Sequence, residues 1–157
     1  MMFREMRRIR QQATEEECLE ILKSAKRGVL AVHGDDDYPY TVPMDFVYED
    51  GCLYFHAAKS GHKLDAVRRN DKVSFCVLSD GVKEENDWFY RFTSVIVFGR
   101  MSEVTGQEEA YRCLRMLGMK YMPTVEMVDA DMEKNAARAA VLKLRIEHMT
   151  GKHVKES

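Results

Sequence analysis

The order of the predicted strands restricts the fold most, because successive strands follow one another without a helix between each pair. Residues 142–148 are the clearest strand, since apolar residues alternate there with Lys143, Arg145 and Glu147. Other strands are predicted at 28–32, 40–48, 52–56, 73–78 and 92–104, and helices at 15–26, 61–70, 107–118 and within 123–140. A doubly wound parallel sheet would need regular alternation. The sequence therefore favours a mainly β, α+β fold: a six-stranded antiparallel barrel with peripheral helices.

Short local signals support three of these elements. Thr14 and Glu17 have the spacing of a capping box, which predicts the start of the first helix. Asp50 and Gly51 predict a tight hairpin turn between the strands 40–48 and 52–56. Pro43 cannot donate a ladder hydrogen bond, so its strand is predicted to be an edge strand or to carry a bulge.

The length of 157 residues and the lack of a linker predict a single domain over 1–157, with a basic N-terminal arm at 1–12. The arginines of this arm could bind nucleic acid, or the arm could lie extended over the domain or a partner subunit. A net charge of −2 favours the second interpretation, because nucleic-acid-binding domains are usually strongly basic. No nucleic-acid partner is expected.

The chain lacks an apolar run of about 20 residues and an apolar segment near its N-terminus, so neither a membrane partner nor secretion is expected. Four widely spaced cysteines lie in apolar patterns, which is typical of reduced core thiols in a cytoplasmic protein. The five histidines show no zinc-binding spacing, so no metal site is expected.

The loop and helix start at 56–65 are the richest candidate for a binding site. Gly61 leads directly into a helix, whose free N–H groups favour an anion. Lys59, Ser60, His62 and Lys63 add cationic and hydroxyl donors. These residues fit a phosphate-binding loop, and they fit equally well an ordinary loop with solvated charges.

Four further features each allow two interpretations. His56 is either a core or interface histidine or a proton donor that faces a ligand. Residues 41–46 form a plain edge strand, or a Pro-interrupted strand whose free backbone groups bind a planar heterocycle. Residues 90–100 place Ser94, Ile96 and Phe98 on one face, in a core strand or beside a ligand. The methionines between 116 and 127 could form either a pocket mouth or a dimer contact.

Together these segments resemble the pyridoxamine 5′-phosphate oxidase-related, FMN-binding split-barrel proteins. The resemblance rests on residues 28–32, 38–43, 54–63, 73–75 and 94–99, and extends from about Met6 to Lys152. Within this group the sequence is most similar to the nitroimidazole-resistance (Nim-type) flavoproteins. The resemblance implies a split β-barrel and a homodimer that holds two FMN molecules at its interface.

The resemblance also implies a role for each matching residue. Gly61, His62 and Lys63 would hold the FMN phosphate. Val42, Pro43, Met44 and Asp45 would line the isoalloxazine ring through their backbone, and His56, Ala57 and Ala58 would lie beneath it. Ser94, Val95 and Lys152 would complete the site, from the partner chain. His56 would be the catalytic residue beside the bound substrate.

The function implied is that of an FMN-dependent oxidoreductase. It would pass electrons from NADH or NADPH, through FMN, to a small aromatic or nitro acceptor. The alternative is a flavin- or haem-binding module without turnover, for storage or sensing. In that case His56 or His62 could serve as an axial haem ligand.

Overall fold

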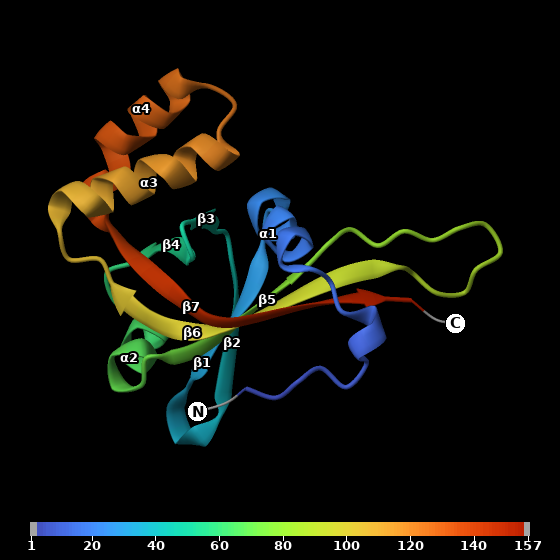
Figure 1. The fold of residues 1–157 in the computed structure, drawn as a ribbon. Coiled ribbons are helices and arrows are strands. Elements are labelled where there is room, and N and C mark those ends of the chain that lie inside the picture. Colours follow the sequence, from blue (N-terminus) through green and yellow to red (C-terminus); the bar gives the residue numbers. More distant parts are fainter. Residues whose placement is uncertain (1–2, 156–157) are drawn as a thin grey trace.

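The computed structural model describes residues 3–155, which form one seven-stranded sheet with α-helices around it (Figure 1). The strands are β1 (Gly28–His33), β2 (Pro39–Met44), β3 (Val47–Glu49), β4 (Cys52–Ala58), β5 (Lys72–Leu78), β6 (Phe92–Glu103) and β7 (Ala139–Val154). The helices are α1 (Glu15–Ser24), α2 (His62–Arg69), α3 (Gln107–Tyr121) and α4 (Val125–Asn135). Short 3-10 turns lie at Ile9–Gln11, Asp35–Asp37 and Ala136–Arg138.

The sheet is curled, and its topology requires this. The strand order is β2-β1-β5-β6-β7-β4-β3, and every neighbouring pair is antiparallel. In a flat sheet the outer strands β2 and β3 would lie about 29 Å apart. Only Asp45 and Phe46 connect them, and a link of that length reaches at most about 11 Å. The two edges of the sheet therefore meet at this connection, which gives the barrel its closed end.

The prediction of a single strand at 40–48 was wrong, so the sheet has seven strands instead of six. The chain breaks at Asp45 and Phe46 into β2 and β3. The side chains of Met44 and Phe46 are both buried, so apolar alternation continues across the break. Periodicity could not reveal the break, because the pattern of buried side chains is uninterrupted. The break depends on a distant residue: the Phe46 N–H donates to the Tyr121 hydroxyl of α3 and not to a neighbouring strand.

The boundaries around α3 and α4 also differ from the prediction. Gly118 does not end α3, which continues to Tyr121. A side chain at Gly118 would lie 3.0 Å from the Val128 side chain, so this glycine allows close packing of α3 on α4. The alanines predicted near the end of the last helix form a 3-10 turn and the start of β7 instead, where Ala139 and Ala140 pair with β4.

The local signals at Thr14, Pro43 and Asp50 are confirmed. The Thr14 hydroxyl accepts the Glu17 N–H at 3.1 Å, and the Glu17 carboxylate accepts the Thr14 N–H at 2.9 Å. Asp50 and Gly51 turn the β3–β4 hairpin with φ angles of 47° and 77°. Pro43 lies in β2, an edge strand of the sheet, where its missing N–H leaves no ladder bond unmade.

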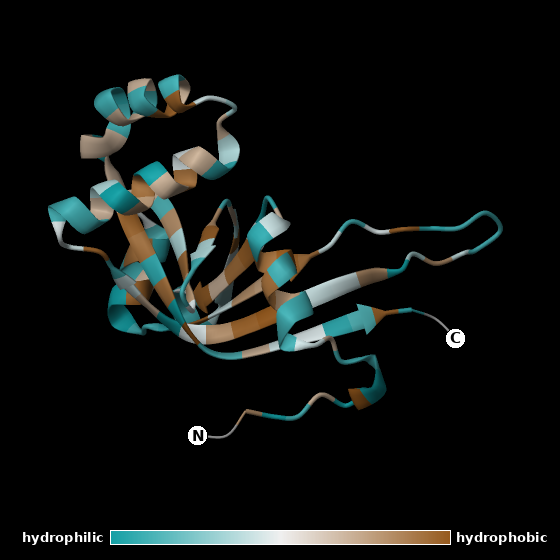
Figure 2. Cartoon of the chain, turned by 45° about the horizontal axis from the view of Figure 1, so that its top comes forward, coloured by the Kyte–Doolittle hydropathy of each residue, from teal (hydrophilic) through white to brown (hydrophobic). Residues whose placement is uncertain are grey.

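The core fills the interior of the barrel. The fully buried rings of Phe46 and Phe55 both pack edge-on against Phe75, with centroid distances of 5.0 and 5.2 Å. Figure 2 shows the apolar residues concentrated in the strands at the centre. A smaller cluster lies outside the barrel beneath α3 and contains Cys52, Tyr54, Cys113 and Val141. Cys76 departs from the core-thiol prediction, because it is half-buried on the outer face of β5.

Two extended segments lie outside this body. The N-terminal arm runs back along the sheet, where Phe3 stacks on His148 at 4.6 Å and on Phe98 at 5.3 Å. Met1 and Met2 of this arm lie outside the described residues. The β5–β6 connection, residues 79–91, projects away from the end that carries α3 and α4, and exposes Trp88 (Figure 1). Among residues 3–155, no helix is long and apolar enough to cross a membrane.

Gly99 tests how tightly β6 and β7 pack at their irregular register. A side chain there would overlap the Arg145 carbonyl oxygen and lie 2.7 Å from the Leu144 side chain. We expect Gly99→Ala to lower the free energy of unfolding by about 1–3 kcal/mol, measured by urea denaturation. Ser102→Ala, at an exposed site of the same strand, should change it by less than about 0.5 kcal/mol. Equal midpoints for the two variants would contradict this packing.

Candidate functional site

A surface cavity of about 490 Å³ gathers most of the sequence-predicted binding residues. We call it the Lys63 cavity. The ends of β2 and β4 form its walls, Lys63 comes from the first turn of α2, and Arg27 comes from the connection between α1 and β1. Its lining residues are Arg27, Pro43, Met44, Asp45, His56, Ala57, Ala58 and Lys63. The barrel closure places β2 beside β4, so segments 43–45 and 56–58 come together.

The Lys63 cavity combines walls of small side chains with positively charged groups. Pro43, Ala57 and Ala58 leave room for a flat group to approach the backbone. Arg27 and Lys63 supply two cations, against the single carboxylate of Asp45. The Arg27 Nε donates to Asp45 Oδ1 at 2.8 Å, and this hydrogen bond raises the pKa of Arg27. The cavity can therefore hold a planar ring that carries an anionic group.

The start of α2 contributes Lys63 to the cavity, but not the His62 side chain. Gly61 precedes the helix with φ 140°, a conformation that L side chains rarely adopt. The His62 ring instead packs on Tyr40 at 4.2 Å, and its Nε2 lies 3.7 Å from an Asp35 carboxylate oxygen. Gly61 and His62 therefore do not line the cavity, whereas Lys63 does.

Four other predicted residues also lie outside the cavity lining of this chain. Val42 is half-buried and packs against the core. Ser94 and Lys152 face each other across β6 and β7. The Val95 side chain is fully buried in the core, so only its backbone is available to a ligand. A single chain thus brings together 43–45, 56–58 and Lys63, and leaves the β6–β7 group apart.

A second cavity, of about 370 Å³, lies beneath the α3–α4 pair, and we call it the helix cavity. It shares only His56 and Asp45 with the Lys63 cavity. Its other lining residues are Leu114, Leu117, Gly118, Tyr121, Met122, Asp131, Met132, Asn135, Ala136 and Ala139. Successive β4 side chains alternate, so Phe55 and Ala57 enter the barrel core while His56 projects outward and is exposed. His56 is therefore not a core histidine.

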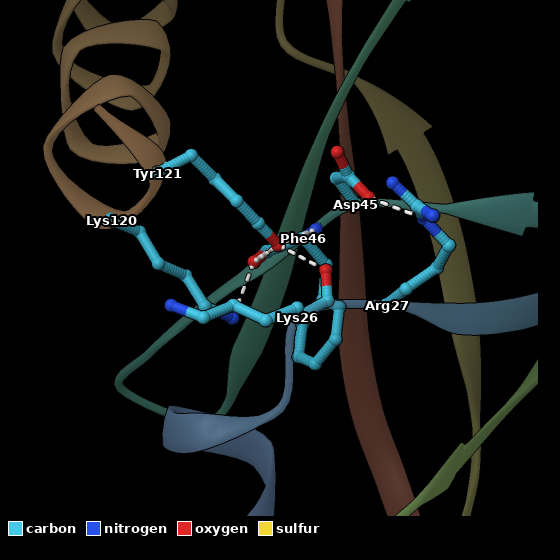
Figure 3. Close-up of polar contacts among 6 residues, drawn as sticks. All are labelled: Lys26, Arg27, Asp45, Phe46, Lys120 and Tyr121. Carbon is cyan, nitrogen blue, oxygen red and sulfur yellow. Dashed lines mark hydrogen bonds and ion pairs between the residues drawn. The ribbon is translucent and has the colours of Figure 1, made fainter. Parts of the chain in front are cut away.

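The sequence analysis missed a polar cluster around the Asp45–Phe46 connection (Figure 3). The Tyr121 hydroxyl accepts the Phe46 N–H at 2.9 Å and lies 2.7 Å from the Lys26 carbonyl oxygen, to which it donates. The Lys120 ammonium donates to the Phe46 carbonyl at 2.8 Å, and lies 4.0 Å from the Phe46 ring centre. No motif marks these contacts, because α3 lies about 75 residues beyond Phe46.

A comparison with protein families identifies the family of this chain. The sequence model of the pyridoxamine 5′-phosphate oxidase family matches residues 14–153. The chain belongs to this family. No curated protein matches it in sequence. The family resemblance expected from the sequence motifs is confirmed.

Solved structures share the fold of this pyridoxamine 5′-phosphate oxidase family member. A candidate 5-nitroimidazole antibiotic resistance protein from Bacteroides thetaiotaomicron is 22% identical, with a TM-score of 0.74 over 89% of this chain and 84% of that chain. An FAD-binding protein from Mesorhizobium loti is 23% identical (TM-score 0.66, 92% and 97%). An FAD- and haem-binding protein from Mycobacterium smegmatis is 20% identical (TM-score 0.77, 93% and 74%).

Lys120 makes the stability of this family member depend on pH, and this dependence can be measured. Burial, aided by the nearby charge of Lys26, lowers the Lys120 pKa from 10.5 to about 8. Between these values the unfolded chain binds more protons than the native state, so this group makes the free energy of unfolding rise with pH. We expect the parent's stability relative to Lys120→Gln to increase from about pH 7 to about pH 10.

Chemical denaturation at several pH values measures this difference. Lys134→Gln, which removes an exposed lysine of α4, is the matched control. A difference between the parent and Lys120→Gln that stays flat or falls with pH would show that the ammonium is not desolvated.

Proposed function

We propose that this protein binds FMN in the Lys63 cavity and acts as a flavin-dependent oxidoreductase on a small aromatic or nitro acceptor. The observation that carries the proposal is the convergence of 43–45, 56–58 and Lys63 on one cavity. Family membership supports it, as does the fold shared with proteins described as FAD-binding. When bound, the flavin supplies the hydride and electron transfer.

The residues present fit a flavin nucleotide. The volume of about 490 Å³ lies within the usual range of small-molecule sites. The Lys63 ammonium and the free amides at the start of α2 suit a phosphate. Pro43, Ala57 and Ala58 have short side chains, so a planar ring can lie against the strand ends and hydrogen-bond to backbone groups.

A second copy of the chain would complete this site. On the outer face of the sheet, Val29, Cys76, Ile96 and Thr150 form one uncharged row across four strands. The exposed fraction is 41% for Val29 and 40% for Ile96. Pro43 continues the row and also lines the Lys63 cavity. A partner packed on this row would border the cavity, which explains how Ser94 and Lys152 could serve the site of the other subunit.

His56 is placed to act on the acceptor. It lines both cavities, so its imidazole can hydrogen-bond to a substrate held beside the flavin ring. In this role it orients the acceptor or donates a proton to it. The hydride donor to the flavin would be NADH or NADPH.

A substitution of Lys63 tests both the identity of the cofactor and the position of its phosphate. We expect Lys63→Ala to weaken FMN binding about tenfold, the effect of losing one charged phosphate contact, and to leave riboflavin binding unchanged. Lys59→Ala, which removes an exposed lysine of the same loop that does not line the cavity, should leave both affinities unchanged. Quenching of flavin fluorescence measures the affinities. Equal FMN affinity in the parent and Lys63→Ala would refute the phosphate assignment.

His56 tests the catalytic assignment. We expect His56→Ala to keep its FMN affinity and to lower kcat/KM for reduction of a nitroaromatic acceptor by roughly 10- to 100-fold. His33→Ala, at an exposed position of β1, is the control. Steady-state kinetics with NADH and with NADPH provide the measurement. Unchanged turnover in His56→Ala would remove this residue from the mechanism.

The visible spectrum separates this proposal from the non-catalytic alternative. Two broad bands that co-elute with a dimer and bleach on adding NADH or NADPH support the oxidoreductase. Bound flavin that neither nicotinamide reduces would indicate a binding module. An intense Soret band would indicate haem, for which His56 or His62, both exposed, would be the axial ligand.

A further inference from the structure

We propose that the helix cavity is the acceptor pocket of this protein, and that it selects uncharged or cationic aromatic compounds over anionic ones. This inference rests on the proposed function, since it places the acceptor beside the flavin. It adds a site formed by α3, α4 and the start of β7, and a rule for the charge of the substrate.

The walls of the helix cavity suit one small aromatic ring. Leu114, Leu117, Met122, Met132 and Ala136 supply an apolar surface from α3, α4 and the residues that directly follow each helix. The volume of about 370 Å³ lies at the lower end of the range for small-molecule sites. Methionine side chains adapt to different flat ligands and make favourable contacts with aromatic rings.

Two carboxylates, Asp131 and Asp45, line the helix cavity, and no lysine or arginine of the described residues does. Asp131 is half-buried, and its Oδ1 accepts the Asn135 amide at 2.8 Å. Among residues 3–155, no lysine or arginine lies within 4.0 Å of the Asp131 carboxylate. The other carboxylate, Asp45, is already paired with Arg27. A carboxylate ligand would meet like charge here, whereas an amide, amine or amidinium group can donate to Asp131.

The two cavities therefore differ in charge on either side of a shared wall. Arg27 and Lys63 line the Lys63 cavity and not the helix cavity. An anionic cofactor is favoured in the first, and a neutral or cationic compound in the second. His56 and Asp45 form the wall between them, so occupants of the two cavities would lie on either side of the His56 imidazole.

Methionine methyl groups provide a readout that does not depend on turnover. We would label the FMN-loaded protein with ¹³C at the methionine methyls and add benzamidine, benzamide or benzoate as probes. Met122 and Met132 line the cavity, whereas Met119 of α3 and Met127 of α4 are exposed and serve as internal controls. We expect benzamidine and benzamide to shift the first pair only, and benzoate to bind at least about fivefold more weakly.

Two variants with matched controls test the lining directly. Ala136→Leu fills the cavity and should abolish the shifts, whereas Ala130→Leu, on an exposed part of α4, should not. Asp131→Asn should weaken benzamidine binding about fivefold and leave benzamide unchanged. Glu126→Gln, an equal change of charge on α4 outside the cavity, should affect neither probe.

The outcomes separate this proposal from the flavin assignment. Benzoate binding as tight as benzamidine binding, or shifts that survive Ala136→Leu, would overturn it. Shifts at Met119 and Met127 alone would also overturn it. Flavin binding that fails while benzamidine still shifts Met122 and Met132 in the protein as purified would refute the proposed function and leave the selective cavity in place.

Discussion

The structure depends on the two-residue connection between β2 and β3. Asp45 and Phe46 join the opposite edges of a seven-stranded sheet, so the sheet must curl until those edges meet. The buried Phe46 ring packs edge-on against Phe75 in the barrel core. Its backbone is held from outside by Tyr121. Buried backbone groups need partners, so a hydroxyl from α3 takes the place of a missing ladder strand here.

This connection also organises the two cavities. Asp45 lies at the closure and pairs with Arg27, which directs the Arg27 cation toward the Lys63 cavity. Opposite it, β4 alternates between the core and the outside, so His56 projects beneath α3 and α4. The same alternation that buries Phe55 and Ala57 therefore places one imidazole between a basic cavity and an acidic one.

Much of the fold follows from local signals in the sequence. The capping box at Thr14, the turn at Asp50–Gly51 and the edge strand with Pro43 each depend on neighbouring residues, and all three are found. The break at Asp45–Phe46 was missed because burial continues across it. Gly118 was read as a helix end because a close helix–helix contact and a terminus both favour glycine.

The sequence by itself determined the antiparallel arrangement and offered the segments 41–46 and 56–65 as candidates for binding, which the family resemblance narrowed to 42–45, 56–58 and 61–63. These depend on periodicity and on residue type at short spacing. Only the tertiary structure decided that Lys63 lines the Lys63 cavity while His62 packs on Tyr40, and that Tyr121 and Asp131 line the helix cavity. Such choices depend on contacts between segments many residues apart, and no local pattern predicts which of two adjacent side chains at a helix start will line a cavity formed by distant strands.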